Sequence, residues 1–153
     1  MHGRPTALDA KGIEPLRFGA DEASAEETLM RWFGVPTHAL QPVHLPPACG
    51  YDRASSWPAL TAYFFRGRFV GYLYRGSQSA PELAGPRGIR VGVPLARAAA
   101  LGGVEFHRSA AEGGSWVLLT PAGKVGGLLT AVPPKGNIET IDGGSLGCQM
   151  LVL

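Results

Sequence analysis

The sequence predicts an α+β domain built from two related halves, each with a helix and mostly antiparallel sheet. Three observations lead to this prediction. Short runs with the composition of strands recur along the chain, two runs have the composition of helices, and two pairs of short stretches resemble each other. The chain of 153 residues has the length of a single domain, 1–153, and its 45% of hydrophobic residues suffices for a core.

The first half begins with a short extended stretch at 12–19 and continues into a helix at 24–33. Ser24 and Glu27 have the spacing of a capping box, and Gly34 followed by Pro36 gives a stop signal. Asp21 is the alternative N-cap. The four prolines of residues 35–50 predict a long loop that reaches Cys49.

A hairpin follows at 57–65 and 69–76, because both runs are rich in aromatic and β-branched residues and flank a short turn that contains Gly67. Residues 76–88 are small and polar with two prolines, which is typical of a linker.

The second half repeats the order of an extended step, a helix and strands. Pro94 is in the favoured place in the first turn of a helix, the alanine-rich run has high helix propensity, and Gly102 closes it. Four strands are predicted after this helix, at 104–109, 115–120, 124–132 and 138–142.

Two matches between the halves favour an internal duplication. Gly19 matches Gly92 at the two extended steps, and "GRFVGYLY" at 67–74 matches "GKVGGLLT" at 123–130. One such unit has too little core to be stable alone, so two would share one. We therefore predict half-repeats at 12–76 and 88–153, with the backbones of 67–74 and 123–130 superposable.

The motifs "GIEPLRFGADEASAEETLMRWFGVP", "GRFVGY" and a closing "I…GG…GC" resemble uncharacterised secreted proteins of high-GC Gram-positive bacteria. The resemblance covers nearly the whole chain, and its motifs are structural. More distantly, the tandem helix-then-sheet units are similar to the secreted beta-lactamase inhibitor protein and to small outer-membrane assembly lipoproteins. Those folds bind proteins without catalysing a reaction. They carry a methionine after the glycine of the helix-entry motif, where this chain has Ala20 and Val93.

The alternative fold is a cone-shaped helix-and-curved-sheet domain of the nuclear-transport-factor type. In such a domain the helix would cover a cavity, which here would be lined by Glu105, His107 and Tyr72. This alternative implies a small enzyme or a ligand-binding protein with a pocket between helix and sheet.

Charge and hydropathy exclude several classes of function. A net charge of +2 gives no clustered positive charge for nucleic acid, so we expect no nucleic-acid partner. We also expect no transmembrane segment, because no run approaches about 20 apolar residues. The first residues contain no apolar signal core. The chain is therefore either cytoplasmic or exported with its signal segment removed. We expect a secreted or cell-envelope location, with cytoplasmic as the alternative.

The two cysteines, Cys49 and Cys148, are compatible with one disulfide or with two separate thiols. In an oxidising compartment we expect them to pair. A catalytic group of Cys49, His107 and Asp142 has no supporting spacing.

Other sites of chemistry have little support. The gaps between His38, His44 and Cys49 are wider than zinc sites prefer. The glycine-rich segments "AGPRG" and "PAGKVGG" do not match a phosphate loop and are expected to be turns. We expect no catalytic residues, no metal and no cofactor.

Aromatic and basic residues crowd the predicted hairpin. Packing within the core is the ordinary explanation of such residues in a sheet, and a binding surface is the other, since tyrosine and arginine are enriched at interfaces. The candidate binding face consists of Tyr63, Phe65, Arg66, Arg68, Tyr72, Tyr74 and Arg75. The sequence thus favours a non-enzymatic extracytoplasmic module that binds a protein or a cell-envelope partner, with an unknown oligomeric state.

Overall fold

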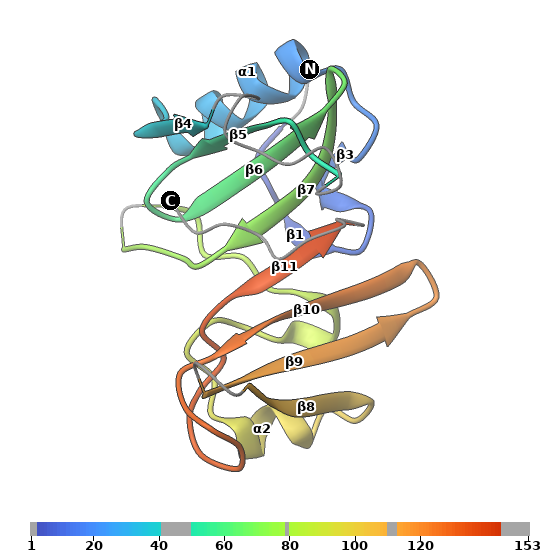
Figure 1. The fold of residues 1–153 in the computed structure, drawn as a ribbon, viewed down its shortest axis with the longest axis vertical. Helices are drawn as coiled ribbons and strands as arrows, with labels where there is room; N and C mark the ends of the chain where they lie inside the picture. The colour runs from blue at the N-terminus through green and yellow to red at the C-terminus, as the bar shows by residue number, and fades with distance from the viewer. Residues whose placement is uncertain (1–2, 41–49, 79, 110–112, 145–153) are drawn as a thin grey trace.

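Strands make up most of the regular structure of this chain. The computed structural model describes residues 3–40, 50–78, 80–109 and 113–144. Within these residues, an eight-stranded antiparallel sheet carries a three-stranded sheet and two short α-helices on one face (Figure 1). The elements in chain order are β1 (Ala7–Asp9), β2 (Gly12–Glu14), β3 (Leu16–Arg17), α1 (Glu22–Phe33), β4 (His38–Leu40), β5 (Arg53–Ser56), β6 (Leu60–Phe65), β7 (Arg68–Tyr74), the 3-10 turn η3 (Pro86–Gly88), α2 (Leu95–Ala99), β8 (Val104–Ser109), β9 (Gly113–Thr120), β10 (Gly123–Leu129) and β11 (Ile141–Gly144).

The large sheet has the order β4-β5-β6-β7-β11-β10-β9-β8. Two meanders, β5 to β7 and β8 to β10, meet on either side of β11. Strand β11 pairs antiparallel with β7 on one side and with β10 on the other. Figure 1 shows it between the green and the orange strands. Continuity of the sheet therefore depends on a strand that comes after both meanders in the sequence.

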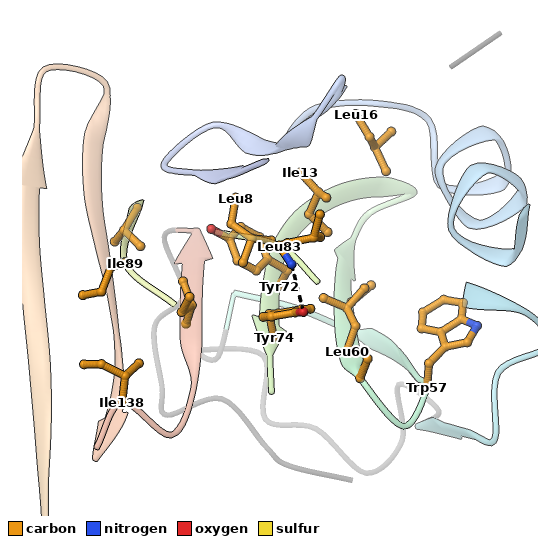
Figure 2. Packing of buried hydrophobic residues seen from close by; sticks show 14 of the residues in the cluster. Leu8, Ile13, Leu16, Trp57, Leu60, Tyr72, Tyr74, Leu83, Ile89 and Ile138 are labelled. Carbon is orange, nitrogen blue, oxygen red and sulfur yellow. Dashed lines mark hydrogen bonds between the residues drawn. The ribbon is translucent and has the colours of Figure 1, made fainter. Parts of the chain in front are cut away.

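The core lies on one face of the large sheet, which we call the inner face. Each strand from β6 across to β9 places alternate side chains on this face, where they lie opposite those of the neighbouring strand. Examples are Phe64 opposite Phe69 and Val125 opposite Leu118. Figure 2 shows part of the cluster, in which Leu8 and Ile13 of the small sheet lie over Tyr72. Both helices contribute to the same cluster, through Ala25, Leu29, Leu95 and Ala98. The opposite side is called the outer face.

Helix α1 is tied to the sheet by one arginine. The Asp21 carboxylate caps the helix by accepting the N–H of Ser24 at 3.2 Å. Arg53 of β5 donates to Glu22 at 2.7 Å and also to Glu26, and its guanidinium lies 4.8 Å from the centre of the Phe64 ring. A largely buried arginine shared between two carboxylates and a ring holds the helix against the inner face.

The chain crosses the inner face closely where it returns toward β11. The Trp116 indole N–H donates to the carbonyl of Thr140 at 3.0 Å, and the N–H of Leu128 donates to the Thr140 hydroxyl at 2.9 Å. Gly127 lies beneath this carbonyl. A Cβ at this position would overlap the carbonyl oxygen and approach the indole nitrogen to 2.6 Å.

The predicted fold class, two related helix-plus-antiparallel-sheet halves of an α+β domain, is wrong. The described residues are mostly β, with α-helices of only 12 and 5 residues and with antiparallel pairing in both sheets. The cone-shaped alternative is wrong for the same reason. The alanine-rich run, predicted as a helix between Pro94 and Gly102, is helical over Leu95–Ala99.

The half-repeats at 12–76 and 88–153 stay a prediction, and the topology constrains them. Strands β7 and β10, which hold the matched stretches, both flank β11 and run in the same direction. The meanders spread from β11 in opposite directions, yet both helices lie on the inner face. No rotation superposes such an arrangement on itself, so any duplicated unit would comprise the hairpin without its helix.

Candidate functional site

The β6–β7 hairpin ends in a two-residue turn that projects its side chains into solvent. Phe65 pairs with Arg68, and Arg66 and Gly67 form the turn between them. We call Phe65, Arg66, Gly67 and Arg68 the hairpin tip. Phe65 is partly exposed, and the other three residues are exposed. The tip is thus the part of the predicted binding face that is open to solvent.

Arg66 has an unusual backbone for an arginine. Its φ of 49° lies in the left-handed region, and Gly67 follows with a φ of 77°. These angles are those of a type I′ turn, in which asparagine or glycine is preferred at the first position. The Arg66 N–H donates to the carboxylate of Asp52 at 3.1 Å, which helps to hold the turn.

The two tip arginines have few interactions within the described part of the chain. The Arg66 guanidinium lies 4.9 Å from the centre of the Phe65 ring. It forms no hydrogen bond or ion pair with a described residue. Arg68 makes one long hydrogen bond, at 3.4 Å, to the carbonyl of Gly19. Both guanidinium groups therefore keep donors available for another molecule.

Three aromatic residues of the predicted binding face are buried, so the exposure predicted for them is not found. Tyr63 lies on the outer face, where its ring centre is 4.7 Å from that of Tyr51. Tyr72 and Tyr74 belong to the core cluster of the inner face, and the Tyr72 hydroxyl donates to the carbonyl of Asp9 at 2.9 Å. Burial raises the pKa of all three hydroxyls. Because side chains alternate between the two faces of a strand, one face was expected to be exposed. In β6, however, both faces are covered.

Arg75, the last residue of the predicted face, is a structural cation. Its guanidinium donates to the carbonyls of Pro58 and Trp57 at 3.1 and 2.8 Å, and to the hydroxyls of Thr61 and Ser56 at 3.1 and 2.8 Å. Desolvation lowers the pKa of Arg75. These bonds hold the turn between β5 and β6.

The residues considered for catalysis are not brought together. His107 lies on β8 and Asp142 on β11, and β9 and β10 lie between these strands. Three strand spacings amount to about 14 Å, too far for a base and its orienting carboxylate. Cys49, like His44 and Cys148, lies outside the described residues, so the disulfide stays a prediction. Burial raises the pKa of Asp142 to about 6, and the positive charge of Lys124 opposes this effect.

The residues predicted to line a cavity in the cone-shaped alternative do not face a common space. Glu105 and His107 are exposed on the outer face of β8, whereas Tyr72 is buried on the inner face. In the part of the chain that the structure describes, no group of three or more His, Cys, Asp or Glu side chains could hold a metal ion.

A groove of about 560 Å³ opens where the chain leaves β7. The Tyr74 hydroxyl in its wall donates to the carbonyl of Pro81 at 3.0 Å and accepts the N–H of Leu83 at 3.1 Å, a bond drawn in Figure 2. Arg75, also in the wall, is bonded to the β5–β6 turn. Glu82 pairs with Arg90 at 3.0 Å. Because these polar groups are already paired within the chain, the groove offers a ligand less than the hairpin tip does.

Neither helix has the length and apolar character needed to cross a membrane, as far as the described residues go. Comparison with known protein families, curated proteins and solved structures gives no match to this chain. The resemblance to secreted proteins of high-GC Gram-positive bacteria therefore stays a prediction, and the candidate site rests on the geometry of the hairpin tip.

Proposed function

We propose that the chain is a binding module that contacts a negatively charged protein surface through the hairpin tip. The observation that supports this proposal most directly is Arg66, an exposed arginine held in a left-handed conformation with its guanidinium over Phe65. Left-handed backbone costs about 1–2 kcal/mol for a residue with a Cβ. Such strain commonly occurs at functional positions.

A comparison with Arg87 supports this interpretation. Arg87 is the other described non-glycine residue with a positive φ, at 59°. Its guanidinium donates to the carbonyls of Leu101 and Gly102 at 3.2 and 2.6 Å, so its conformation serves the packing of α2. The Arg66 guanidinium makes no comparable bond to a described residue; only its backbone N–H is bonded, to Asp52.

The charges around the tip favour an acidic partner. Carboxylates near the tip are already engaged: Asp52 and Asp21 accept the backbone N–H groups of Arg66 and Ser24, and Glu22 pairs with Arg53. Among the described residues, most donors of the Arg66 and Arg68 guanidinium groups have no partner. Arginine over an aromatic ring is a common element of binding surfaces and pairs well with carboxylates.

Binding of a labelled glutamate-rich peptide, followed by fluorescence anisotropy, tests the proposal. We expect Arg66→Asn and Arg68→Ala each to weaken binding by about two- to fivefold, because exposed ion pairs contribute about 0.5–1 kcal/mol. Added salt should weaken binding further. Arg97→Ala is the matched control, since Arg97 is exposed on α2 at the other end of the sheet. Equal binding of a glutamine-rich peptide, or an equal loss on Arg97→Ala, would contradict the proposal.

The Arg66→Asn chain should also be more stable than the unmodified chain. Asparagine suits the first position of a type I′ turn, so the free energy of unfolding should rise by about 0.5–1 kcal/mol. Urea denaturation measures the change, with Arg68→Ala as the comparison. A gain in stability combined with a loss of binding separates a functional role of Arg66 from a structural one, whereas a loss of stability would show that arginine serves the turn.

The proposal places the module outside the cytoplasm, with Cys49 joined to Cys148. This pairing would close a loop of about 100 residues and stabilise the fold by up to about 4–5 kcal/mol. Intact mass with and without reductant tests it, because the oxidised chain should be lighter by the two hydrogens that a disulfide loses. Two titratable thiols in chain purified under air would contradict the disulfide and favour a cytoplasmic location.

A further inference from the structure

Strand β8 forms a free edge of the large sheet. It pairs with β9 over its whole length, from Val104 opposite Leu118 to Ser109 opposite Gly113, and with no other described strand. Natural proteins commonly protect such an edge with charged side chains, proline or a bulge. β8 has no proline, and its register with β9 is unbroken. Its charged side chains, Glu105 and Arg108, disfavour a strand of like charge and leave pairing open to a strand of complementary charge. The edge is therefore competent to pair with another strand.

The turn between β9 and β10 determines which backbone groups point outward. Thr120 and Gly123 flank the two-residue turn and so form a hydrogen-bonded pair. Alternation from this pair directs the backbone groups of Val117 and Ser115 toward β8, where they meet Glu105 and His107. The remaining β8 residues, Val104, Phe106 and Arg108, thus direct their N–H and C=O groups away from the sheet.

Side chains of this strand alternate between the two faces, and its outer face carries an acidic and a basic residue. Glu105 and His107 are exposed on the outer face, 3.6 Å apart between Oε2 and Nε2. Val104 and Phe106 are partly buried on the inner face, where they pack against the core cluster. An acidic and a basic side chain two residues apart on one face can each meet its opposite when the strand pairs antiparallel with a copy of itself.

We propose that two copies of this chain pair through β8, antiparallel and centred on Phe106. In this register Phe106 lies opposite its equivalent, and Val104 lies opposite Arg108 of the second copy. The outward N–H and C=O groups of these residues then find partners. Glu105 lies opposite His107 of the second copy in a non-hydrogen-bonded pair, the kind in which side chains approach most closely. The two glutamates and two histidines alternate around a four-membered cluster on the outer face.

Helix α2 lies beside β8 (Figure 1). Its exposed side chains include Ala96 and Ala99, and Ala100 and Leu101 are exposed just beyond its end. Small apolar side chains next to the edge permit close approach and add apolar area to that buried by the strands. The interface is isologous, so it closes at two copies and does not propagate. This proposal does not depend on the hairpin tip.

Sedimentation equilibrium at micromolar concentrations measures the dissociation constant of the dimer, and variants that exchange the charges at residues 105 and 107 test the proposed pairing. We expect His107→Glu to weaken dimerisation at least tenfold, because it places two glutamates opposite each other twice in the interface. The double variant Glu105→Lys with His107→Glu should restore the dimer, because opposite charges face each other again. Lys11→Glu is the control, since Lys11 is exposed in the turn between β1 and β2, away from the edge.

A second pair of variants tests the backbone part of the interface. Arg108→Pro removes an N–H that points away from the sheet, which a single copy tolerates, whereas Arg108→Ala keeps it. We expect only the proline to weaken the dimer, with circular dichroism showing both chains folded. A wild-type chain that stays monomeric, a dimer insensitive to His107→Glu, or a double variant that fails to restore association would each overturn the proposal. Restoration together with sensitivity to Arg108→Pro supports it.

Discussion

Replacing Gly127 with alanine should lower the free energy of unfolding by about 3–5 kcal/mol, a large part of the stability of an ordinary domain. The cause is the crossing of the inner face by the carbonyl of Thr140. A methyl group on Gly127 would overlap that oxygen and lie 2.6 Å from the Trp116 indole nitrogen and 2.7 Å from the Thr140 carbonyl carbon. This overlap is relieved only if the segment around Thr140 moves away from β10, which breaks the hydrogen bond from Trp116 to Thr140.

Thermal unfolding measures this effect, and we expect a fall in Tm of about 10–20 °C. Gly3→Ala is the matched control, because a Cβ on Gly3 meets no atom within 4 Å. If the Gly127→Ala chain is too unstable to purify, Trp116→Phe tests the same crossing by removing the indole N–H, together with part of the buried ring volume. A Gly127→Ala chain as stable as Gly3→Ala would show that the Thr140 segment does not lie against β10 in solution.

Replacing Asp142 with asparagine should stabilise the chain at neutral pH by up to about 3 kcal/mol. Burial on the outer face raises the pKa of Asp142 from 3.8 to about 6, so the folded chain holds this proton more tightly than the unfolded chain does. Stability is therefore unaffected by Asp142 below pH 3.8, falls as the pH rises from 3.8 to 6, and is constant above that.

Urea denaturation at a series of pH values tests this prediction. The Asp142→Asn chain should lack the component of the pH dependence between pH 3.8 and 6 that the wild-type chain shows. Glu139→Gln is the matched control, since Glu139 is exposed three residues earlier in the same segment. Parallel pH profiles of the wild-type and Asp142→Asn chains would contradict the burial of an ionised carboxylate at this position.

Local structure was predictable wherever it depends on neighbouring residues. The helix that ends at Gly34, the hairpin around Gly67 and the strands after Gly103 follow from caps, turns and β-branched runs, and the structure has them close to the predicted bounds. Asp21, which was the alternative cap, proved to be the N-cap of α1. Strand β5 was missed because "RASS" has no apolar alternation, and its role depends on pairing with β6.

The fold class was not predictable, because short strands such as β1 and β4 have no signal apart from the sheet they join. The extended stretch predicted at 12–19 contains β2 and β3, but no local pattern shows that they form a separate sheet. The candidate site was predictable only in part for a related reason. The alternation of side chains around Tyr63 predicts one exposed face. Both faces of β6 are buried there, and no local sequence pattern indicates that the second face is covered. The tip residues were found because a two-residue turn exposes its side chains wherever the sheet lies.

The position of β11 also governs how the chain must fold during synthesis. β11 follows every other described strand in the sequence, yet it pairs between β7 and β10. While the nascent chain grows, the edges of both meanders that will receive β11 are open, and the core they share is incomplete. Closure of the sheet is a late event that joins segments far apart in sequence, which is the kind of step that makes β proteins fold slowly. The two waiting edges are the places where an incomplete chain is most exposed to aggregation, and a chaperone that shields them would raise the yield of folded protein.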